Sequence, residues 1–140
     1  LDTLQKLIAD VKPLLIDVLP ANGARVEPAS GAWADLPVHR DIPGSHWLPN
    51  VGRGKIEAWQ QAYFTARLAA LSKGDKAAPM VIYCQSDCWM AYNALKRARE
   101  LGYSRLYWFP EGSDGWRDFD SELVAVTPDP VDPAIAKDAK

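Results

Sequence analysis

The sequence predicts an α/β fold in which a small, mostly parallel sheet is flanked by helices. Two apolar runs, residues 80–83 and 105–109, have the length of buried strands, and a helical pattern covers residues 90–101 between them. Parallel strands need a long connection of this kind, usually one that contains a helix, whereas a tight turn joins antiparallel strands. The three segments therefore predict a strand–helix–strand unit and an at least partly parallel sheet.

Further elements are predicted before this unit. Residues 2–10 carry apolar side chains at helical spacing, and Pro13 prevents the helix from continuing. The apolar run 14–18 then predicts another strand. Residues 56–72 show the clearest helical periodicity of the chain, and Gly74 follows at the position where helices commonly end.

Two other stretches are rich in turn-forming residues. Residues 20–50 contain repeated prolines and glycines without lasting periodicity, so we expect a long surface loop that packs over the sheet through its apolar side chains. Residues 112–116 predict a tight turn that leads into a short helix. We expect a single domain over residues 1–126 and a loose, proline-rich tail over residues 127–140.

Composition narrows the classes of function. The 140 residues are 48% hydrophobic and include six tryptophans, enough for one proper core. Lysine and arginine number 16 against 18 acidic residues, a balance that argues against nucleic acid as a partner, because such surfaces show a basic excess. No apolar stretch approaches the roughly 18 residues that a membrane span requires, so no span is expected.

The most informative motif holds both cysteines of the chain, Cys84 and Cys88, directly after a predicted strand. Ligands gather at the carboxyl ends of parallel strands, and the backbone N–H groups at a helix start favour a thiolate. Cys84 is therefore the expected reactive residue. The loop expected around it contains Gln85, Ser86, Asp87, Trp89 and Met90.

Three roles are open for Cys88. As a resolving thiol it would attack a persulfide or mixed disulfide on Cys84, because residues four apart can reach the ~4.4–6.8 Å Cα spacing of a disulfide. As a structural partner it would form a permanent disulfide with Cys84 that holds the turn together. As a soft ligand it would join Cys84 in holding Cu(I) or zinc, with His39 or His46 from the long loop. Otherwise a plain surface or hydrogen-bonding role is expected of both histidines, and no resident metal or cofactor is expected.

Two further residues have both a functional and a structural interpretation. Asp17 ends a predicted strand at the same sheet edge as Cys84, where it could orient a substrate, tune the thiol or cap a turn. Trp89 could cover the sulfur site or be a core residue at the helix start. Core positions are expected for the aromatic residues Trp59, Tyr107, Trp108 and Trp116.

Four segments in order resemble the landmarks of a rhodanese-like domain: residues 15–18, 42–45, 81–84 and 112–116. The resemblance implies a small α/β domain with a mostly parallel sheet. It also implies that Cys84 is the nucleophile at the head of a loop wrapped around its own sulfur, and that sulfurtransferase activity is the enzymatic function to consider.

The predicted loop departs from that of active rhodaneses, which commonly carry arginine just after the cysteine and near the loop end. Gln85 and Trp89 take those places here, and Asp87 lies where a glycine is common. With no cation in the loop, only backbone N–H groups and the helix start would offset a bound negative charge. The sequence therefore predicts weak binding of thiosulfate-like dianions.

More narrowly, residues 84–89 with Asn93, Lys96, Arg97 and residues 112–116 resemble the CXXCW-motif proteins associated with PQQ-dependent alcohol catabolism. Membership would imply export to the periplasm of a Gram-negative bacterium, with a signal peptide removed. It would also imply association with a PQQ-dependent alcohol dehydrogenase or a cytochrome c as partner. No residue of the chain indicates a site for PQQ itself.

The leading hypothesis is a thiol protein in which Cys84 accepts sulfane sulfur or forms a mixed disulfide and Cys88 resolves it. Its partners would be small sulfur species or a protein thiol. One alternative is a non-catalytic binding module with a Cys84–Cys88 disulfide and exposed aromatic residues. The other is a copper or zinc carrier that uses both cysteines.

Overall fold

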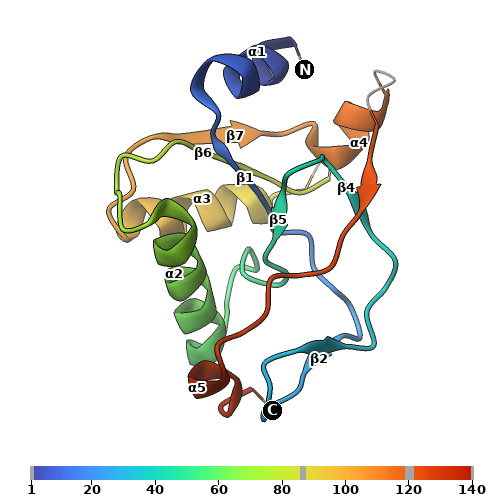
Figure 1. Ribbon diagram of the computed structural model, residues 1–140, viewed down its shortest axis with the longest axis vertical. Helices are drawn as coiled ribbons and strands as arrows, with labels where there is room; N and C mark the ends of the chain where they lie inside the picture. The colour runs from blue at the N-terminus through green and yellow to red at the C-terminus, as the bar shows by residue number, and fades with distance from the viewer. Residues whose placement is uncertain (1, 86–87, 119–121, 140) are drawn as a thin grey trace.

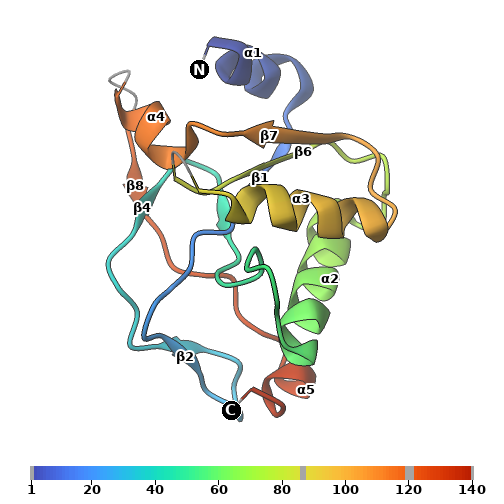
Figure 2. The same ribbon diagram turned by 180° about the vertical axis from the view of Figure 1, so that it is seen from behind.

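The computed structural model describes residues 2–85, 88–118 and 122–139, and a four-stranded parallel sheet lies at its centre. The strand order is β5 (His46–Trp47), β1 (Leu14–Asp17), β6 (Met80–Tyr83) and β7 (Leu106–Phe109). Helix α1 (Asp2–Val11) lies on one side of this sheet, and α2 (Ala58–Ser72) and α3 (Met90–Glu100) lie on the other, as Figures 1 and 2 show. The predicted small α/β fold with a flanked parallel sheet is confirmed.

Smaller elements surround the sheet. Two antiparallel pairs are formed by β2 (Arg25–Val26) with β3 (Trp33–Ala34) and by β4 (Arg40–Asp41) with β8 (Val124–Ala125). Helix α4 (Gly112–Asp118) follows β7, and α5 (Pro133–Ala136) lies near the C-terminus.

Side chains on opposite faces of the central strands divide the core into two layers. Ile16 and Ile82 belong to a cluster with apolar side chains of α2 and α3, whereas Leu15 and Val81 belong to a second cluster with those of α1. Successive side chains of a strand point to opposite faces, so both layers are filled by the same strands. Strand β6 is buried along its whole length, as expected for a central parallel strand covered on both faces.

Helix α2 begins two residues later than the sequence predicted because local hydrogen bonds define its start. The backbone N–H of Glu57 donates to Gln60 Oε1 at 2.8 Å, and the Glu57 side chain accepts a backbone N–H in return. This reciprocal arrangement satisfies N–H groups that a helix start otherwise leaves unpaired. At the other end, Lys73 and Gly74 adopt positive φ angles of 55° and 78°, which terminate the helix.

The stretch predicted as a long loop, residues 20–50, contributes an edge strand to the main sheet. Strand β5 pairs in parallel with β1, with His46 opposite Ile16 and Trp47 opposite Asp17. Two residues are too few to show a strand periodicity, so the sequence pattern could not indicate this pairing. The expectation that the stretch packs over the sheet is confirmed by the full burial of Ile42 and Leu48.

The expectation of a loose tail is wrong. Val131, Ala136 and Ala139 are buried in the core layer that also contains α2. The carbonyl of Asp129 accepts hydrogen bonds from Tyr63 Oη at 2.6 Å and from Trp33 Nε1 at 3.0 Å. Pro133 begins the short helix α5, and the short apolar residues around the prolines pack into the core. The division of the chain at residue 126 stays a prediction.

No helix among the described residues is long and apolar enough to cross a membrane.

Burial of the tail leads to a stability prediction. Val131→Ala removes two methyl groups from a side chain that is 1% exposed, and should lower the free energy of unfolding by about 2 kcal/mol. The matched control is Val38→Ala, because Val38 is 94% exposed and its truncation should change stability by less than about 0.5 kcal/mol. Urea denaturation of both variants checks this, and equal stabilities would contradict the packing of the tail.

Candidate active site

The cysteine loop begins where β6 ends. Cys84 follows Tyr83 directly and is 1% exposed, whereas Cys88 is partly exposed. Their Cα atoms are 6.0 Å apart and their Sγ atoms are close enough for a disulfide. The spacing that the sequence allowed is therefore realised. Ser86 and Asp87 lie outside the described residues.

Backbone hydrogen bonds hold the start of this loop against α4. The backbone N–H of Ser113 donates to the carbonyl of Cys84 at 3.0 Å, and Gln85 forms an isolated antiparallel bridge with Gly112. Gly112 has a φ of 64°, and a Cβ at this position would overlap the backbone of Cys84 and Gln85. Glycine is required here for both reasons. The turn predicted at residues 112–116 is thus the first turn of a helix that holds Cys84 in place.

Helix α3 fixes the other end of the loop. It begins at Met90, which is partly buried, and Gly52 packs so closely against the Met90 backbone that a Cβ would clash. Arg97 donates to the carbonyls of Val51 and Gly54 at 2.8 and 2.9 Å. Its cation lies in the last turn of the helix, where positive charge is favourable, and it also ties α3 to the segment before α2.

Aromatic side chains gather on the surface next to Cys88. Trp89 is 67% exposed, so the interpretation of Trp89 as a core residue is wrong. Its ring lies 5.9 Å from that of Tyr92 and 5.8 Å from that of Trp108, and the last two rings are 5.5 Å apart. We call Trp89, Tyr92 and Trp108 the aromatic platform.

The prediction that the aromatic side chains of strand β7 lie in the core is also wrong. Tyr107 and Trp108 were expected in the core, yet each is 37% exposed. β7 is an edge strand of the sheet, which covers a side chain less completely than a central position does. The expected core positions of Trp59 and Trp116 are confirmed in part, since both rings pack against the apolar clusters while staying partly exposed.

A buried polar network lies at the same sheet edge as Cys84. His39 Nε2 donates to Asp17 Oδ2 at 2.6 Å, and lies 3.6 Å from Asp41 Oδ2. The Tyr83 hydroxyl donates to Asp41 Oδ1 at 2.6 Å. Both carboxylates are fully buried, so each charge depends on these neighbours. Asp17 also accepts from the backbone N–H of Leu19 at 2.8 Å, which confirms the turn-capping interpretation of this residue.

The network shifts the pKa values of its members. Burial disfavours the charged imidazole of His39, but hydrogen bonds and charges from Asp17 and Asp41 outweigh it and raise its pKa to about 9. The pKa of Asp17 is raised, chiefly by burial, with the neighbouring Asp41 carboxylate adding to the effect. Burial also opposes ionisation of Asp41, yet hydrogen bonds from His39 and other donors lower its pKa. The network therefore holds a proton well above neutral pH.

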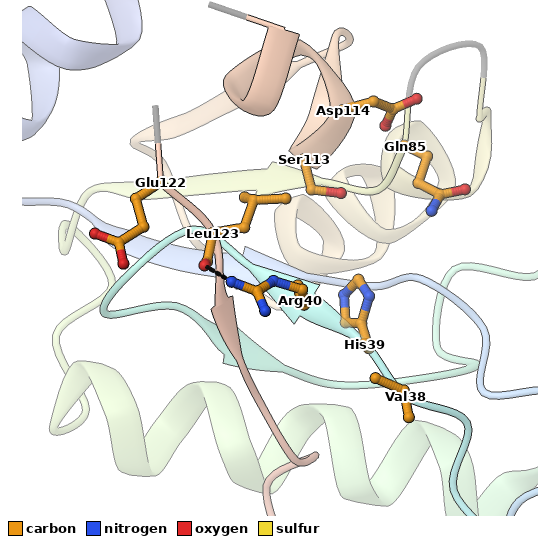
Figure 3. A pocket seen from close by; sticks show the side chains of 8 residues that line it. All are labelled: Val38, His39, Arg40, Gln85, Ser113, Asp114, Glu122 and Leu123. Atoms are coloured by element: carbon orange, nitrogen blue, oxygen red, sulfur yellow. Dashed lines mark hydrogen bonds between the residues drawn. The ribbon is translucent and has the colours of Figure 1, made fainter. Parts of the chain in front are cut away.

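The network borders a cavity of about 550 Å³ beside the start of the cysteine loop. Figure 3 shows the side chains around it, which come from four parts of the chain. Its wall includes one side chain of the network, His39, and one of the loop, Gln85. Arg40 donates to the carbonyl of Leu123 at 2.7 Å across it. The remaining wall residues are Val38, Ser113, Asp114 and Glu122.

In this structure each of the two histidines contacts an aspartate rather than a cysteine. His46 Nδ1 faces Asp129 Oδ2 at 3.4 Å and His39 is held by Asp17. Within residues 2–85, 88–118 and 122–139, the ligand atoms close enough to share a metal ion belong to Asp17, His39 and Asp41. Two carboxylates and an imidazole can bind a divalent ion, and in this structure the 2.6 Å contact between His39 and Asp17 is a hydrogen-bond distance.

The fold and this loop agree with a known family. The family model of the rhodanese-like domain matches residues 1–119. The chain belongs to the rhodanese-like domain family. Cys84 therefore stands at the end of the central strand of a rhodanese-like sheet, within the matched region. No curated protein matches the chain in sequence.

Three solved structures are similar to this chain, and the first of them shows the same fold. A structure of EanB in complex with hercynine matches with a TM-score of 0.58 and 14% identity over 91% of this chain, which spans 31% of the length of that chain. A human single-domain sulfurtransferase matches with a TM-score of 0.49 and 21% identity, covering 84% of this chain and 92% of its own. The polysulfide-sulfur transferase homodimer of Wolinella succinogenes gives 0.49 and 18% identity, with coverages of 88% and 73%.

The sequence predicts Asp17 and the start of the cysteine loop, Cys84 and Gln85, at one sheet edge, and the structure places Asp17 opposite Tyr83, the residue directly before Cys84. The sequence did not indicate Asp41 or Tyr83, and it predicts an ordinary role for His39. Asp41 lies in a stretch without periodicity, and Tyr83 had the pattern of an ordinary strand residue. The one signal that could have drawn attention to the network is the alternation of histidine and aspartate at positions 39 and 41.

The raised pKa of His39 predicts a loss of stability in alkaline solution. The folded protein holds a proton that the unfolded chain releases near pH 6.5, so this stabilisation is complete below about pH 6.5 and lost as pH rises through about 9. The expected loss is about 3 kcal/mol in the free energy of unfolding. His39→Gln should show a much smaller decrease over the same range.

Urea denaturation at several pH values, for wild type and His39→Gln in parallel, measures this difference. Comparing the two proteins cancels the titration of lysine and tyrosine side chains elsewhere. Identical slopes against pH would show that His39 does not carry the retained proton.

Proposed function

We propose that this protein transfers sulfur or exchanges disulfides through Cys84, with Cys88 as the resolving thiol. The observation that carries the proposal is the position of the pair: Cys84 ends the central strand of a rhodanese-like sheet, and Cys88 lies close enough to bond to it. Rigid elements hold both ends of the loop, α4 at Cys84 and α3 just after Cys88. A dithiol held in this way can cycle without rearrangement of the fold.

The proposed cycle has three steps: persulfide formation, disulfide formation and reduction. The Cys84 thiolate attacks the sulfane sulfur of a donor, forms a persulfide and releases the remainder of the donor with its electron pair. The Cys88 thiolate then attacks Cys84 Sγ, forming the Cys84–Cys88 disulfide and expelling hydrosulfide. Two electrons from an external thiol pair return the disulfide to the dithiol. Direct exchange with a protein disulfide would use the same two cysteines without a sulfane sulfur.

The nature of the cavity supports a donor that carries little charge. His39 and Arg40 line it, and Asp114 and Glu122 contribute carboxylates elsewhere around it. Gln85 adds a neutral side chain next to Cys84. Such mixed charge offers a dianion like thiosulfate little net attraction, so we favour an organic polysulfide or an organic persulfide, whose sulfur chain carries at most one negative charge.

A second candidate function is a non-catalytic binding module with a permanent Cys84–Cys88 disulfide. The exposure of the aromatic platform favours it, because exposed tryptophan and tyrosine side chains are enriched where proteins bind one another. The two candidates differ in whether the disulfide is ever reduced.

A location in the periplasm and an association with PQQ-dependent alcohol catabolism complete the proposal. They are supported by the resemblance of residues 84–89 and the following helix to the CXXCW-motif proteins. A Cys84–Cys88 disulfide would persist in such an oxidising compartment. Fractionation of cells that express the protein with its natural upstream sequence tests the location.

The sulfur-transfer steps predict distinct masses for three forms of the protein. After reduction and exposure to a polysulfide, Cys88→Ser should retain a persulfide of about 32 Da on Cys84, because no second thiol removes it. Wild type should instead lose about 2 Da as the disulfide forms and hydrosulfide is released. Cys84→Ser should show neither change.

Intact mass spectrometry with peptide mapping measures these products, and sulfide can be quantified in the same samples. If Cys84→Ser acquires sulfur as readily as Cys88→Ser, then Cys84 is not the acceptor. If reduced wild type forms no disulfide and no persulfide, the binding module becomes the better account.

A further inference from the structure

The two sulfurs of the Cys84–Cys88 pair differ in their access to the outside. Cys84 is 1% exposed and belongs to the main apolar cluster of the core. Cys88 is partly exposed and lines a hollow at the surface together with Trp89, Trp108 and Pro110. Attack on a disulfide requires that the nucleophile reach one of its sulfur atoms. Within residues 2–85, 88–118 and 122–139, Cys88 is the more accessible sulfur of the bonded pair, so a nucleophile reaches the disulfide more readily from its side.

The hollow is small and its walls are apolar. Its volume of about 120 Å³ corresponds to roughly four water molecules, well below the roughly 300–1,000 Å³ of sites for cofactors and drug-sized ligands. A single side chain of modest size fits such a space. Two of its walls are indole rings of the aromatic platform, which continues beyond the hollow to Tyr92.

We propose that the disulfide is reduced by a cysteine of a partner polypeptide, which enters this hollow, attacks Cys88 and releases Cys84 as the leaving thiolate. This inference rests on the proposed function, because it concerns the step that returns the pair to its dithiol form. It assigns Cys88, which the sequence suggested as the resolving thiol, as the point of entry for the reductant. Trp89 and Trp108 are assigned as its docking surface.

The reaction balances without any further reagent. The partner thiolate forms a bond to Cys88 Sγ as the bond between Cys88 and Cys84 breaks, and Cys84 leaves with the electron pair and later takes up a proton. A second thiol of the partner then attacks its own sulfur in the mixed disulfide and expels Cys88 as a thiolate. The protein gains two electrons and the partner ends as a disulfide.

The surface around the hollow is the reason to assign a polypeptide rather than a small thiol. Four of the five large hydrophobic side chains that are exposed among the described residues lie on α3, β7 or just before α3: Trp89, Tyr92, Tyr107 and Trp108. Three of them form the aromatic platform, which exceeds what a single thiol side chain would cover. Residues that flank the partner cysteine would pack on these rings, as apolar groups do at protein interfaces.

The test compares how fast different thiols reduce the wild-type disulfide. The probes are two blocked tripeptides, one with cysteine between two phenylalanines and one with cysteine between two glycines, together with free cysteine. Reduction is followed by acid quenching, alkylation and mass spectrometry. Packing of aromatic side chains on the platform should make the first peptide about tenfold faster than the second.

A matched pair of variants locates the effect. Trp108→Ala should abolish the preference for the aromatic peptide, because it removes one wall of the hollow. Tyr107→Ala should leave it unchanged: Tyr107 is equally exposed, but it lies opposite Val81 in the sheet and borders α1 residues on the other face. The comparison of peptides on wild type does not depend on the folding of either variant.

Mapping the mixed disulfide identifies the attacked sulfur. In early quenched samples the peptide should be bonded to Cys88 while Cys84 carries the alkyl group. A peptide bonded to Cys84, equal rates for the two peptides, or free cysteine as fast as the aromatic peptide would each overturn this inference while leaving persulfide formation on Cys84 intact. A disulfide that none of the thiols reduces would overturn the proposed function as well.

Discussion

The parallel pairing of β1 with β6 is the constraint on which the site depends. Its register places Asp17 opposite Tyr83, so the last residue of one strand and the residue before Cys84 reach the same sheet edge. Asp17 binds His39 there, and Tyr83 binds Asp41. These two contacts hold the segment that contains His39 and Asp41, just before β5, against the sheet edge. Because these groups are buried, each charge or hydroxyl is stable only while its partner is present. A register shift of one residue would break both contacts and move the cysteine loop away from its cavity.

The cysteine loop separates two environments of opposite character. On the side of Gln85 it borders a polar cavity that includes a positively charged His39 at neutral pH. On the side of Cys88 it borders exposed indole rings and a small apolar hollow. A chemical cycle with two different reactants can use both sides: a sulfur donor near Cys84, and a reductant at Cys88.

Much of the fold and part of the site could be predicted because the signals are local. The strand Met80–Tyr83 and the helix after it have the length and periodicity of buried elements, and the cysteines lie between them. The position of Asp17 followed from the rule that parallel strands end at one edge. Errors arose where a side chain's environment depends on distant parts of the chain. Trp108 lies on an edge strand, and the small apolar residues of the tail pack into a core cluster built from distant segments.

The sequence by itself determined the strand–helix–strand unit, the family landmarks and the position of Cys84 at the end of a strand, because spacing and residue type within a few turns of chain are sufficient for these. Only the tertiary structure decided that His39 and Asp41 form one buried network with Asp17, and that Cys84 is enclosed while Cys88 faces an aromatic surface. Burial and charge pairing arise between segments that are far apart in sequence. Their free energies therefore depend on the packed arrangement of the whole chain rather than on any local pattern.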